Sequence, residues 1–485
     1  MPFDISRNLS PLAYKEGINT GMKLLRYPIA FLLLLSAFLA CKKESFITSS
    51  NATISISTDS LRFDTVFTTA GSITQSFTVV NTNTQKLRLS AISLAGGNAS
   101  AFKINVDGFS GPEIHDIDIE ANDSIYVFVS VTIQPSAANL PFLVLDSLQF
   151  SFNGNVRKVQ LEAYGQNAHF LKSQLITGSV NWSNDLPYVI LGGLLIDSNA
   201  ILTVNEGCRI YLHADAPFIV DGSLQCNGTK SDSIIFQGDR LDQDYRDLPA
   251  SWPGIYFRSN SRNNVLTHTI IKNAYQGLIA DAPSTNGNPK LALYQCVVDN
   301  IYDIGILALN SRILAENCLV TNCGSNIVLA RGGEYQFTHC TVASYGNLYL
   351  DHKNPVLYLN NWDSSSGSLI TYSMNAAFLN CIFWGDNGTV DDELILSRKG
   401  NNNFSVLLDH DLYKAKNDPT DALLNNIIRN QDPLFDSISV NTQYFDFHIG
   451  LRSSPAIGAG IPTSVTTDLD DKARPASPTL GCYEK

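Results

Sequence analysis

The chain has 485 residues, a formal net charge of −12 and a pI near 5.1. This length favours two or three domains over a single core. The acidic residues are scattered, and no stretch forms the basic stripe that nucleic-acid binding requires, so DNA and RNA are not expected as partners. Helical periodicity is nearly absent, and short β-branched runs separated by Gly, Asn and Asp predict an all-β protein.

The first residues predict an export signal. Residues 1–40 contain a basic start at Lys23 and Arg26 and an apolar run over residues 29–39, which is too short for a comfortable membrane span. Residues 1–21 lack these features. Met22 is therefore the expected initiator.

Cys41 directly follows the apolar run and Ala40. This arrangement resembles a bacterial lipobox, in which the cysteine thiol is lipidated and becomes the first residue of the mature protein. The resemblance implies a lipidated tether over residues 41–51 and an outer-membrane protein anchored at the cell surface, with the membrane as its partner. The alternative is an ordinary signal peptide followed by an unrelated cysteine.

Residues 52–166 alternate between apolar and polar side chains over seven or eight short runs, with turn signals such as Asn153-Gly154 between them. This pattern predicts an antiparallel β-sandwich. The phrases at residues 77–81, 124–135 and 161–165 resemble immunoglobulin-like modules of the bacterial choice-of-anchor type. The resemblance implies a spacer or a protein-interaction domain without chemistry of its own.

Residues 167–184 are predicted to be a linker and N-terminal cap, and residues 185–432 a solenoid. A short phrase recurs at residues 269–273, 296–300, 318–322, 340–344 and 381–385, and Cys296, Cys318 and Cys340 follow one another at intervals of 22 residues. A fixed period of this size indicates stacked turns of chain. The small residue and the Ile or Val two positions on are expected inside, with Asn in a tight turn. The short apolar runs between residues 194 and 236, with the phrases at residues 207–210 and 219–224, resemble the entry coils of right-handed parallel β-helix proteins of the pectin-lyase-like fold.

The cysteines of the repeat are interpreted as small buried apolar residues. Disulfides between Cys318 and Cys323, or between Cys208 and Cys226, remain open in an oxidising compartment. Zinc is disfavoured because no CxxC pair accompanies the repeats.

Residues 418–429 are predicted to form a short helix, and residues 433–485 a C-terminal cap. The phrases at residues 432–435, 445–449, 454–460, 467–471, 474–475 and 480–484 resemble the cap of choice-of-anchor Q β-helix proteins, although Gly458, Asp471 and Cys482 depart from that family's pattern. Such a cap is expected to cover the strand edges of the last coil.

No pair of outward carboxylates repeats on neighbouring coils. Instead, an acidic loop is the candidate ligand or calcium site, and its residues are Asp239, Asp242, Asp244, Asp247, Arg246 and Trp252. The simpler interpretation, which the sequence favours, is a solvated loop whose Asp and Arg side chains pair internally. Longer loops at residues 281–289 and 351–373 interrupt the repeat, and function is expected on such loops because the strands are committed to stacking.

Two functions therefore stand as expectations. The first is a non-catalytic, lipid-anchored envelope protein that presents a surface for a glycan or an envelope protein, with no cofactor except possible calcium. The second is a polysaccharide lyase or glycoside hydrolase of the pectin-lyase-like fold. An enzyme of this kind needs carboxylates, with a basic residue for a lyase, in one groove.

Overall fold

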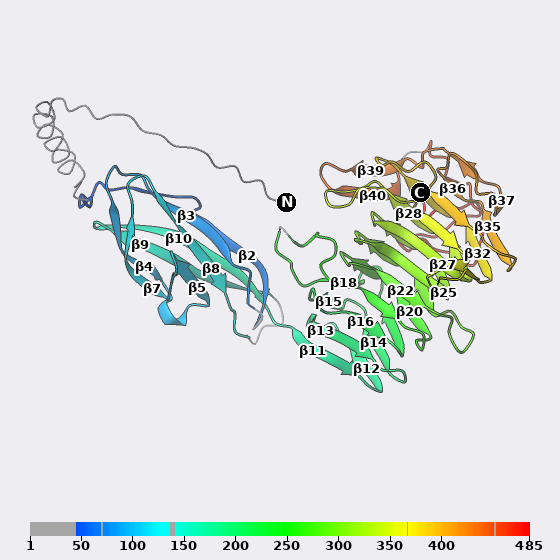
Figure 1. Ribbon diagram of the computed structural model, residues 1–485, viewed down its shortest axis with the longest axis horizontal. Helices are drawn as coiled ribbons and strands as arrows, with labels where there is room; N and C mark the ends of the chain where they lie inside the picture. The colour runs from blue at the N-terminus through cyan, green and yellow to red at the C-terminus, as the bar shows by residue number, and fades with distance from the viewer. Residues whose placement is uncertain (1–44, 69–70, 136–140, 244, 366, 451–452) are drawn as a thin grey trace, which may run out of the picture. The chain divides into compact units, whose positions relative to one another are not determined.

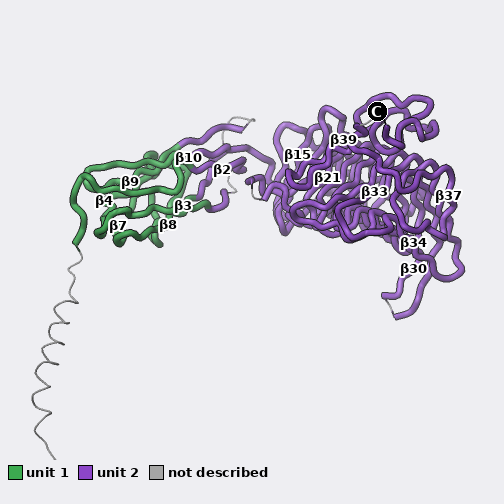
Figure 2. The backbone as a smooth tube through the Cα atoms, turned by 90° about the horizontal axis from the view of Figure 1, so that it is seen from above, with its two compact units in different colours: residues 1–60, 75–129, 146–160 green, residues 61–74, 130–145, 161–485 purple. Residues whose placement is uncertain are grey.

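A computed structural model describes residues 45–68, 71–135, 141–243, 245–365, 367–450 and 453–485, and its described elements are almost entirely β-strands (Figure 1). The predicted signal segment and Cys41 lie outside these residues. No helix among the described residues is long and apolar enough to cross a membrane. The chain divides into two compact units, of which the first comprises residues 1–60, 75–129 and 146–160 (Figure 2).

The N-terminal strands form two five-stranded sheets, as the alternating pattern predicts. Pairs such as β3 with β8 and β4 with β9 are antiparallel. Alternate side chains of β8 are buried, and the rings of Phe77 and Phe150, one from each sheet, meet edge to face at 6.1 Å. One sheet contains β1 (Ile54–Ile56), β3 (Gln75–Asn81), β8 (Ser124–Val131), β5 (Phe102–Val106) and β6 (Phe109–Ser110). The other contains β2 (Ser60–Phe67), β10 (Asn155–Gln166), β9 (Phe142–Phe152), β4 (Leu87–Leu94) and β7 (Glu113–Ile119).

The rest of the chain is a parallel β-helix whose strands pair with those one turn away along three ladders. Ladder A comprises β12 (Ser179–Trp182), β14 (Ile201–Asn205), β17 (Ser223–Asn227), β20 (Asn264–Thr267), β23 (Leu291–Tyr294), the second halves of β25 (Ile304–Glu316) and β27 (Ser325–Thr338), β32 (Met374–Leu379), β35 (Phe404–Asp409) and β37 (Leu423–Asn425).

Ladder B carries the repeated phrase. It comprises the first halves of β11 (His169–Ile176) and β13 (Tyr188–Ile196), then β15 (Arg209–Leu212), β18 (Ile234–Gly238), β21 (Thr269–Lys272), β24 (Val297–Asp299), β26 (Leu319–Thr321), β28 (Thr341–Ser344), β33 (Ile382–Gly385), β36 (Leu412–Tyr413) and β38 (Ile428–Arg429). Ladder C comprises the second halves of β11 and β13, then β16 (Phe218–Val220), β19 (Ile255–Phe257), β22 (Leu278–Asp281), the first halves of β25 and β27, β29 (Leu357–Asn360) and β34 (Leu394–Ser397).

The solenoid begins before its expected first residue and ends within its expected bound at residue 432. Residues 167–184, predicted as a linker and cap, contain β11 and β12, which pair in parallel with β13 and β14. The helix predicted over residues 418–429 is wrong: this segment forms β37 and β38, the last strands of ladders A and B. Leu423 and Leu424 stack on Leu407 and Leu408 of the preceding turn, and this pairing outweighs local helix propensity.

The repeated cysteines stack as predicted. The registers place Cys296, Cys318, Cys340 and Cys381 on successive turns of ladder B, and all four are buried. All eight cysteines within the described residues are free, so neither Cys318 with Cys323 nor Cys208 with Cys226 forms a disulfide. The cysteines are part of the apolar core.

The repeated asparagines occupy the expected tight turns. Asn273, Asn300 and Asn322 have φ values of 62°, 55° and 49°, in the left-handed region that Asn tolerates better than most residues. Their side chains also bond along the solenoid: Asn300 Nδ2 donates to Asn273 Oδ1 at 2.8 Å.

Residues 433–485 were expected to cover the last coil. Instead, they lie along the side of the solenoid. The hairpin β39 (Phe435–Ser439) and β40 (Tyr444–Ile449) packs with the tail on the apolar outer face of ladder B. The tail contacts one turn after another through Gln295, Asn317, Thr341 and Asn380. The outward side chains of ladder B, such as Leu319 and Ile382, explain this placement, because they need an apolar cover.

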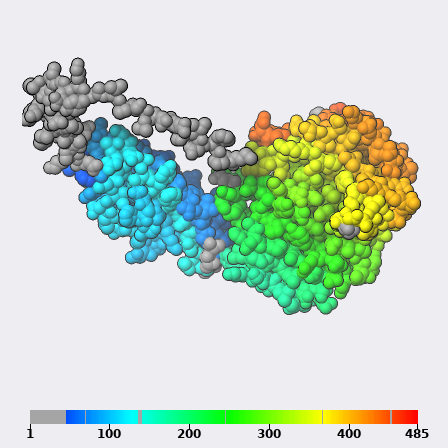
Figure 3. All heavy atoms as spheres, viewed as in Figure 1, coloured from blue at the N-terminus to red at the C-terminus, as the bar shows by residue number. Residues whose placement is uncertain are grey.

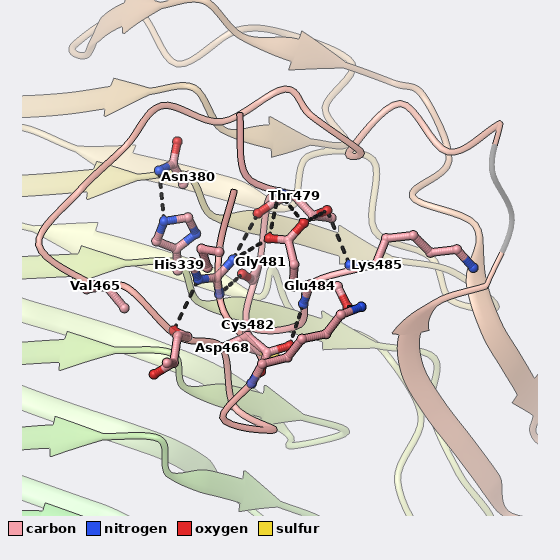
Figure 4. A network of polar contacts seen from close by, with 12 residues as sticks. His339, Asn380, Val465, Asp468, Thr479, Gly481, Cys482, Glu484 and Lys485 are labelled. Atoms are coloured by element: carbon pink, nitrogen blue, oxygen red, sulfur yellow. Dashed lines mark hydrogen bonds and ion pairs between the residues drawn. The ribbon is translucent and has the colours of Figure 1, made fainter. Parts of the chain in front are cut away.

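A buried ion pair holds this tail. Arg474 and Glu484 lie 3.3 Å apart, with side chains only 3% and 6% exposed. Arg474 also donates to Asn317 Oδ1 at 2.8 Å, and Glu484 accepts from Thr479 Oγ1 at 2.6 Å (Figure 4). Burial, with the nearby Arg474 charge, lowers the pKa of His339 to about 3, so this histidine is neutral where it meets Asn380.

Candidate functional site: a polar groove between two loops

The described carboxylates of the acidic loop all have side-chain partners. Asp239 lies 2.7 Å from His213 Nδ1, and Arg240 makes a two-pronged contact with Asp242 at 2.7 and 3.0 Å. Asp247 pairs with Arg246 at 3.2 Å. Asp244 lies outside the described residues. Asp242 and Asp247 therefore pair within the loop, as in the simpler interpretation of the sequence, whereas the partner of Asp239 lies outside the loop.

Trp252 is a core residue and not a platform for sugar. It is 1% exposed, and its indole N–H donates to the Lys272 carbonyl at 2.9 Å, which ties the end of the loop to the coil. Among the described residues no group of three or more His, Cys, Asp or Glu side chains is placed to hold a metal ion. Of the predicted site residues, Asp247 lines a pocket together with Lys272 and Asp299.

A larger polar groove of about 510 Å³ lies where the two long loops approach ladder A. Residues 283–288 of the first loop form one wall, and Tyr372 and Ser373, at the end of the second, form the other. The second loop is interrupted by β29 and carries the small hairpin of β30 (Trp362–Asp363) and β31 (Ile370–Thr371), which projects from the coils in Figure 2 and stands at the surface, in yellow, in Figure 3. The groove is lined by Pro283, Ser284, Gly287, Asn288, Asn310, Ser311, Arg312, Gly333, Glu334, Tyr372, Ser373, Asn375 and Asn403.

The first wall is fixed by a buried lysine at the end of its loop. The Lys290 ammonium donates to the carbonyl oxygens of Arg258, Ser259 and Ser261 at 3.0, 2.9 and 3.0 Å. Burial lowers its pKa to about 8. Ser311 Oγ, on the coil, also donates to the Ala282 carbonyl of the loop at 2.9 Å.

The second wall is fixed by glycines and a buried amide. Gly333 N donates to the Ser373 carbonyl at 2.9 Å, and a Cβ on Gly332 would lie only 2.3 Å from the same oxygen. Asn361 is fully buried and donates to the carbonyls of Tyr372 and Lys399 at 3.2 and 2.9 Å. Both walls are therefore held by the coils, which makes the groove preformed.

The lining carries hydrogen-bonding groups of both kinds. Arg312 and Glu334 pair at 3.2 Å while remaining 44% and 62% exposed, and both can contact a ligand. Asn288, Asn375 and Asn403 add exposed amides. Among the described residues, Ser284 Oγ is a buried hydroxyl with no hydrogen-bond partner. Glu334 is the one carboxylate in the lining, whereas hydrolysis of a glycosidic bond commonly requires two.

The sequence interpretation anticipated the loops but not the coil residues between them. Lys290, Arg312 and Glu334 are spaced 22 residues apart, as are the cysteines, and the register continues from Glu334 to Asn375. The stacking that aligns the inward cysteines therefore also aligns Arg312, Glu334 and Asn375 in an outward polar row, whereas the side chain of Lys290, one turn earlier, is buried. That row was the signal for this groove.

No family model matches the sequence, and no curated protein matches it. Solved structures match short parts of the chain. A family 123 glycoside hydrolase from Clostridium perfringens is 9% identical over 25% of this chain and 30% of its own, with a TM-score of 0.18. A PapD-like domain of human CEP192 is 12% identical over 26% of this chain and 94% of its own, with a TM-score of 0.18. The E. coli chaperone DraB is 9% identical over 24% and 55%, with a TM-score of 0.17. Similarities at these TM-scores carry no argument about this chain.

Proposed function

We propose that the protein is a non-catalytic, lipid-anchored envelope protein whose β-helix binds a glycan in the groove between its two loops. The observation that carries the proposal is the lining: a preformed channel of amides, one Arg–Glu pair and Tyr372, with donors and acceptors side by side. Hydroxyl-rich ligands match such mixed donors and acceptors. An aromatic side chain offers an apolar face to a sugar ring.

The enzyme alternative requires groups that the groove lining does not supply. A hydrolase of the common kind needs an acid and a second carboxylate on opposite sides of the bond. Glu334 has no carboxylate partner in the lining, and its charge is already matched by Arg312. Binding without bond cleavage is therefore the function that this geometry supports best.

A glycan array and a polysaccharide panel distinguish the two functions. We expect saturable binding of at least one glycan, with no new reducing ends and no uronide double-bond absorbance when calcium is present. Cleavage of a bound polysaccharide would establish the enzyme instead. If an envelope protein were captured and no glycan bound, the partner would be a protein.

The proposed anchor is tested separately by the lipidation of Cys41. We expect wild-type protein to label with a fatty-acid analogue in cells and to fractionate with the outer membrane, because several acyl chains give stable anchoring. Cys41→Ser should abolish both properties, with Cys208→Ser as a matched control because that thiol is buried in the coil. Unlabelled wild-type protein in the soluble fraction would contradict the anchor.

A further inference from the structure

A second pocket, of about 220 Å³, lies on the outside of ladder B at the asparagine turns. Its walls come from four separate segments: the acidic loop, the coils, residues 347–349 and the β39–β40 hairpin. It is lined by Asp247, Lys272, Asn273, Asp299, Asn300, Asn322, Asn347, Leu348, Tyr349, Gln443 and Phe445. None of these residues lines the groove.

These walls are bonded to one another. Asn300 Nδ2 donates to the Asp247 carbonyl at 2.7 Å, and Asn347 Nδ2 donates to Asn300 Oδ1 at 2.7 Å. The Leu348 N–H donates to Gln443 Oε1 at 2.9 Å, which ties the loop to the hairpin. The pocket is therefore preformed, so a ligand would not have to order its walls.

The pocket holds one charge of each sign, and the two lie close enough to interact without forming a direct ion pair. Lys272 and Asp299 are register partners on β21 and β24, and both side chains are partly buried. The Lys272 ammonium has no hydrogen bond or ion pair with any other described residue. Asp299 accepts a hydrogen bond from Thr321 Oγ1 at 2.8 Å but has no ion-pair partner within the described chain. Asp247, the remaining charged side chain of the lining, is matched by Arg246.

Asn322 adds a free donor beside these charges. The residue is 2% exposed, and its Oδ1 accepts from the Tyr345 N–H at 3.1 Å. Its Nδ2 has no hydrogen-bond partner among the described residues, although it lines the pocket. A ligand oxygen in the pocket could therefore accept a hydrogen bond from this amide.

The outer wall is apolar. Leu348 and Tyr349 are 73% and 40% exposed, and Phe445 lines the pocket beside them. A ligand that fits all of these features carries a cation, an anion and a small apolar group.

We propose that this pocket binds a free amino acid with an apolar side chain. Its ammonium meets Asp299, its carboxylate meets Lys272 and Asn322 Nδ2, and its side chain lies against Leu348 and Tyr349. Burial raises the pKa of Asp299, and a bound ammonium would favour the ionised carboxylate again. This binding is separate from glycan binding in the groove.

Calorimetric titration with L-leucine, N-acetyl-L-leucine and L-leucinamide tests the proposal on the unmodified protein. The two derivatives each remove one charge, so we expect saturable binding of L-leucine and at least about tenfold weaker binding of both derivatives. The other standard amino acids form the comparison panel, in which glutamate should bind worse than leucine because it brings a second carboxylate. Equal binding of leucine and its derivatives, or no binding by any amino acid, overturns the proposal.

Variants locate the site. Asp299→Asn and Lys272→Met nearly preserve side-chain size and should each weaken leucine binding about tenfold or more. Glu334→Gln, in the groove, is the matched control and should leave leucine binding unchanged. If either pocket variant failed to fold, as judged by its thermal transition, the comparison of derivatives on wild-type protein would still decide the question.

Discussion

At the residue scale, His448 of the β39–β40 hairpin fastens the C-terminal tail to that hairpin. His448 stacks on Tyr483 and contacts Asp446 Oδ1 and Asp470 Oδ2 at 2.5 and 2.7 Å. Burial alone would lower the pKa of His448, but the hydrogen bonds and charges of Asp470 and Asp446 outweigh it, and the net shift is upward. The charged imidazolium is thus favoured in the folded state.

This shift predicts a pH-dependent contribution to stability. A histidine whose pKa is raised on folding stabilises the protein fully below its unfolded pKa, and the contribution disappears as pH rises through the folded pKa. We expect His448→Gln to lower the melting temperature at pH about 5.5 and to have little effect at pH about 8.5. Because the imidazole is 42% exposed, solvent screening limits the effect to about 1 kcal/mol or less. A difference that grows towards alkaline pH would contradict this assignment.

Next to the groove, the backbone at Gly332 lies close to the backbone at Ser373. Gly332 has a φ of 72°, and a Cβ there would meet the Ser373 carbonyl at 2.3 Å. Gly332→Ala should lower the free energy of unfolding by about 2–3 kcal/mol, combining strain and a steric clash. Gly367 has a φ of 82° with nothing within 4 Å of its Cβ position, so Gly367→Ala is the control and should cost about 1 kcal/mol. Equal losses in chemical denaturation would show that the clash does not matter.

At the element scale, the C-terminal tail covers the apolar outer face of ladder B and is held by Arg474. Arg474→Leu leaves Glu484 buried without its partner, which should cost about 3–5 kcal/mol in local stability. Hydrogen exchange of residues 453–485 is the readout, and we expect protection to fall there first. Arg398→Leu is the control: its pair with Asp421 is 3.7 Å long and half-exposed, and should contribute about 0–1 kcal/mol. Exchange that is unchanged in Arg474→Leu would rule out this role.

The solenoid could be read from the sequence because its signal is repetition. The 22-residue interval of Cys296, Cys318 and Cys340 fixes which turns are neighbours, and Asn at the fifth position marks the turn. The C-terminal tail carries no such period. Its position depends on which outer face needs cover, and the sequence does not show that Leu319 and Ile382, two turns apart on ladder B, share one apolar outer face.

The acidic loop and the groove also differ in how far the sequence could reveal them. The acidic loop was the predicted ligand site because its charges are adjacent in sequence. In the structure, Asp242 and Asp247 pair with arginines of the same loop. The groove unites Asn288, Arg312, Glu334 and Asn403, which are distant in sequence and meet only through the stacking of turns. The spacing of Lys290, Arg312 and Glu334 was visible, but spacing alone does not say that two loops wall the row.

At the scale of the whole molecule, the β-helix is a rigid frame and its loops carry recognition. The inward ladders of Cys, Val and Ile are committed to the core, while the groove and the small pocket lie outside it at different corners of the coils. In this account the proposed lipid anchor holds the frame at the membrane. The groove then presents a fixed set of amides and charges to a glycan.

The most direct test is equilibrium titration of the tightest-binding array glycan against wild-type protein and the double variant Asn375→Ala/Asn403→Ala. Both side chains are exposed, so the substitutions should leave the fold intact, and loss of two hydrogen-bonding amides should weaken binding about tenfold or more. Gln336→Ala, an exposed position two residues beyond Glu334 on β27 that does not line the groove, is the control and should bind as wild type. Unchanged affinity in the double variant, or an equal loss in Gln336→Ala, would contradict the claim that the groove is the binding site.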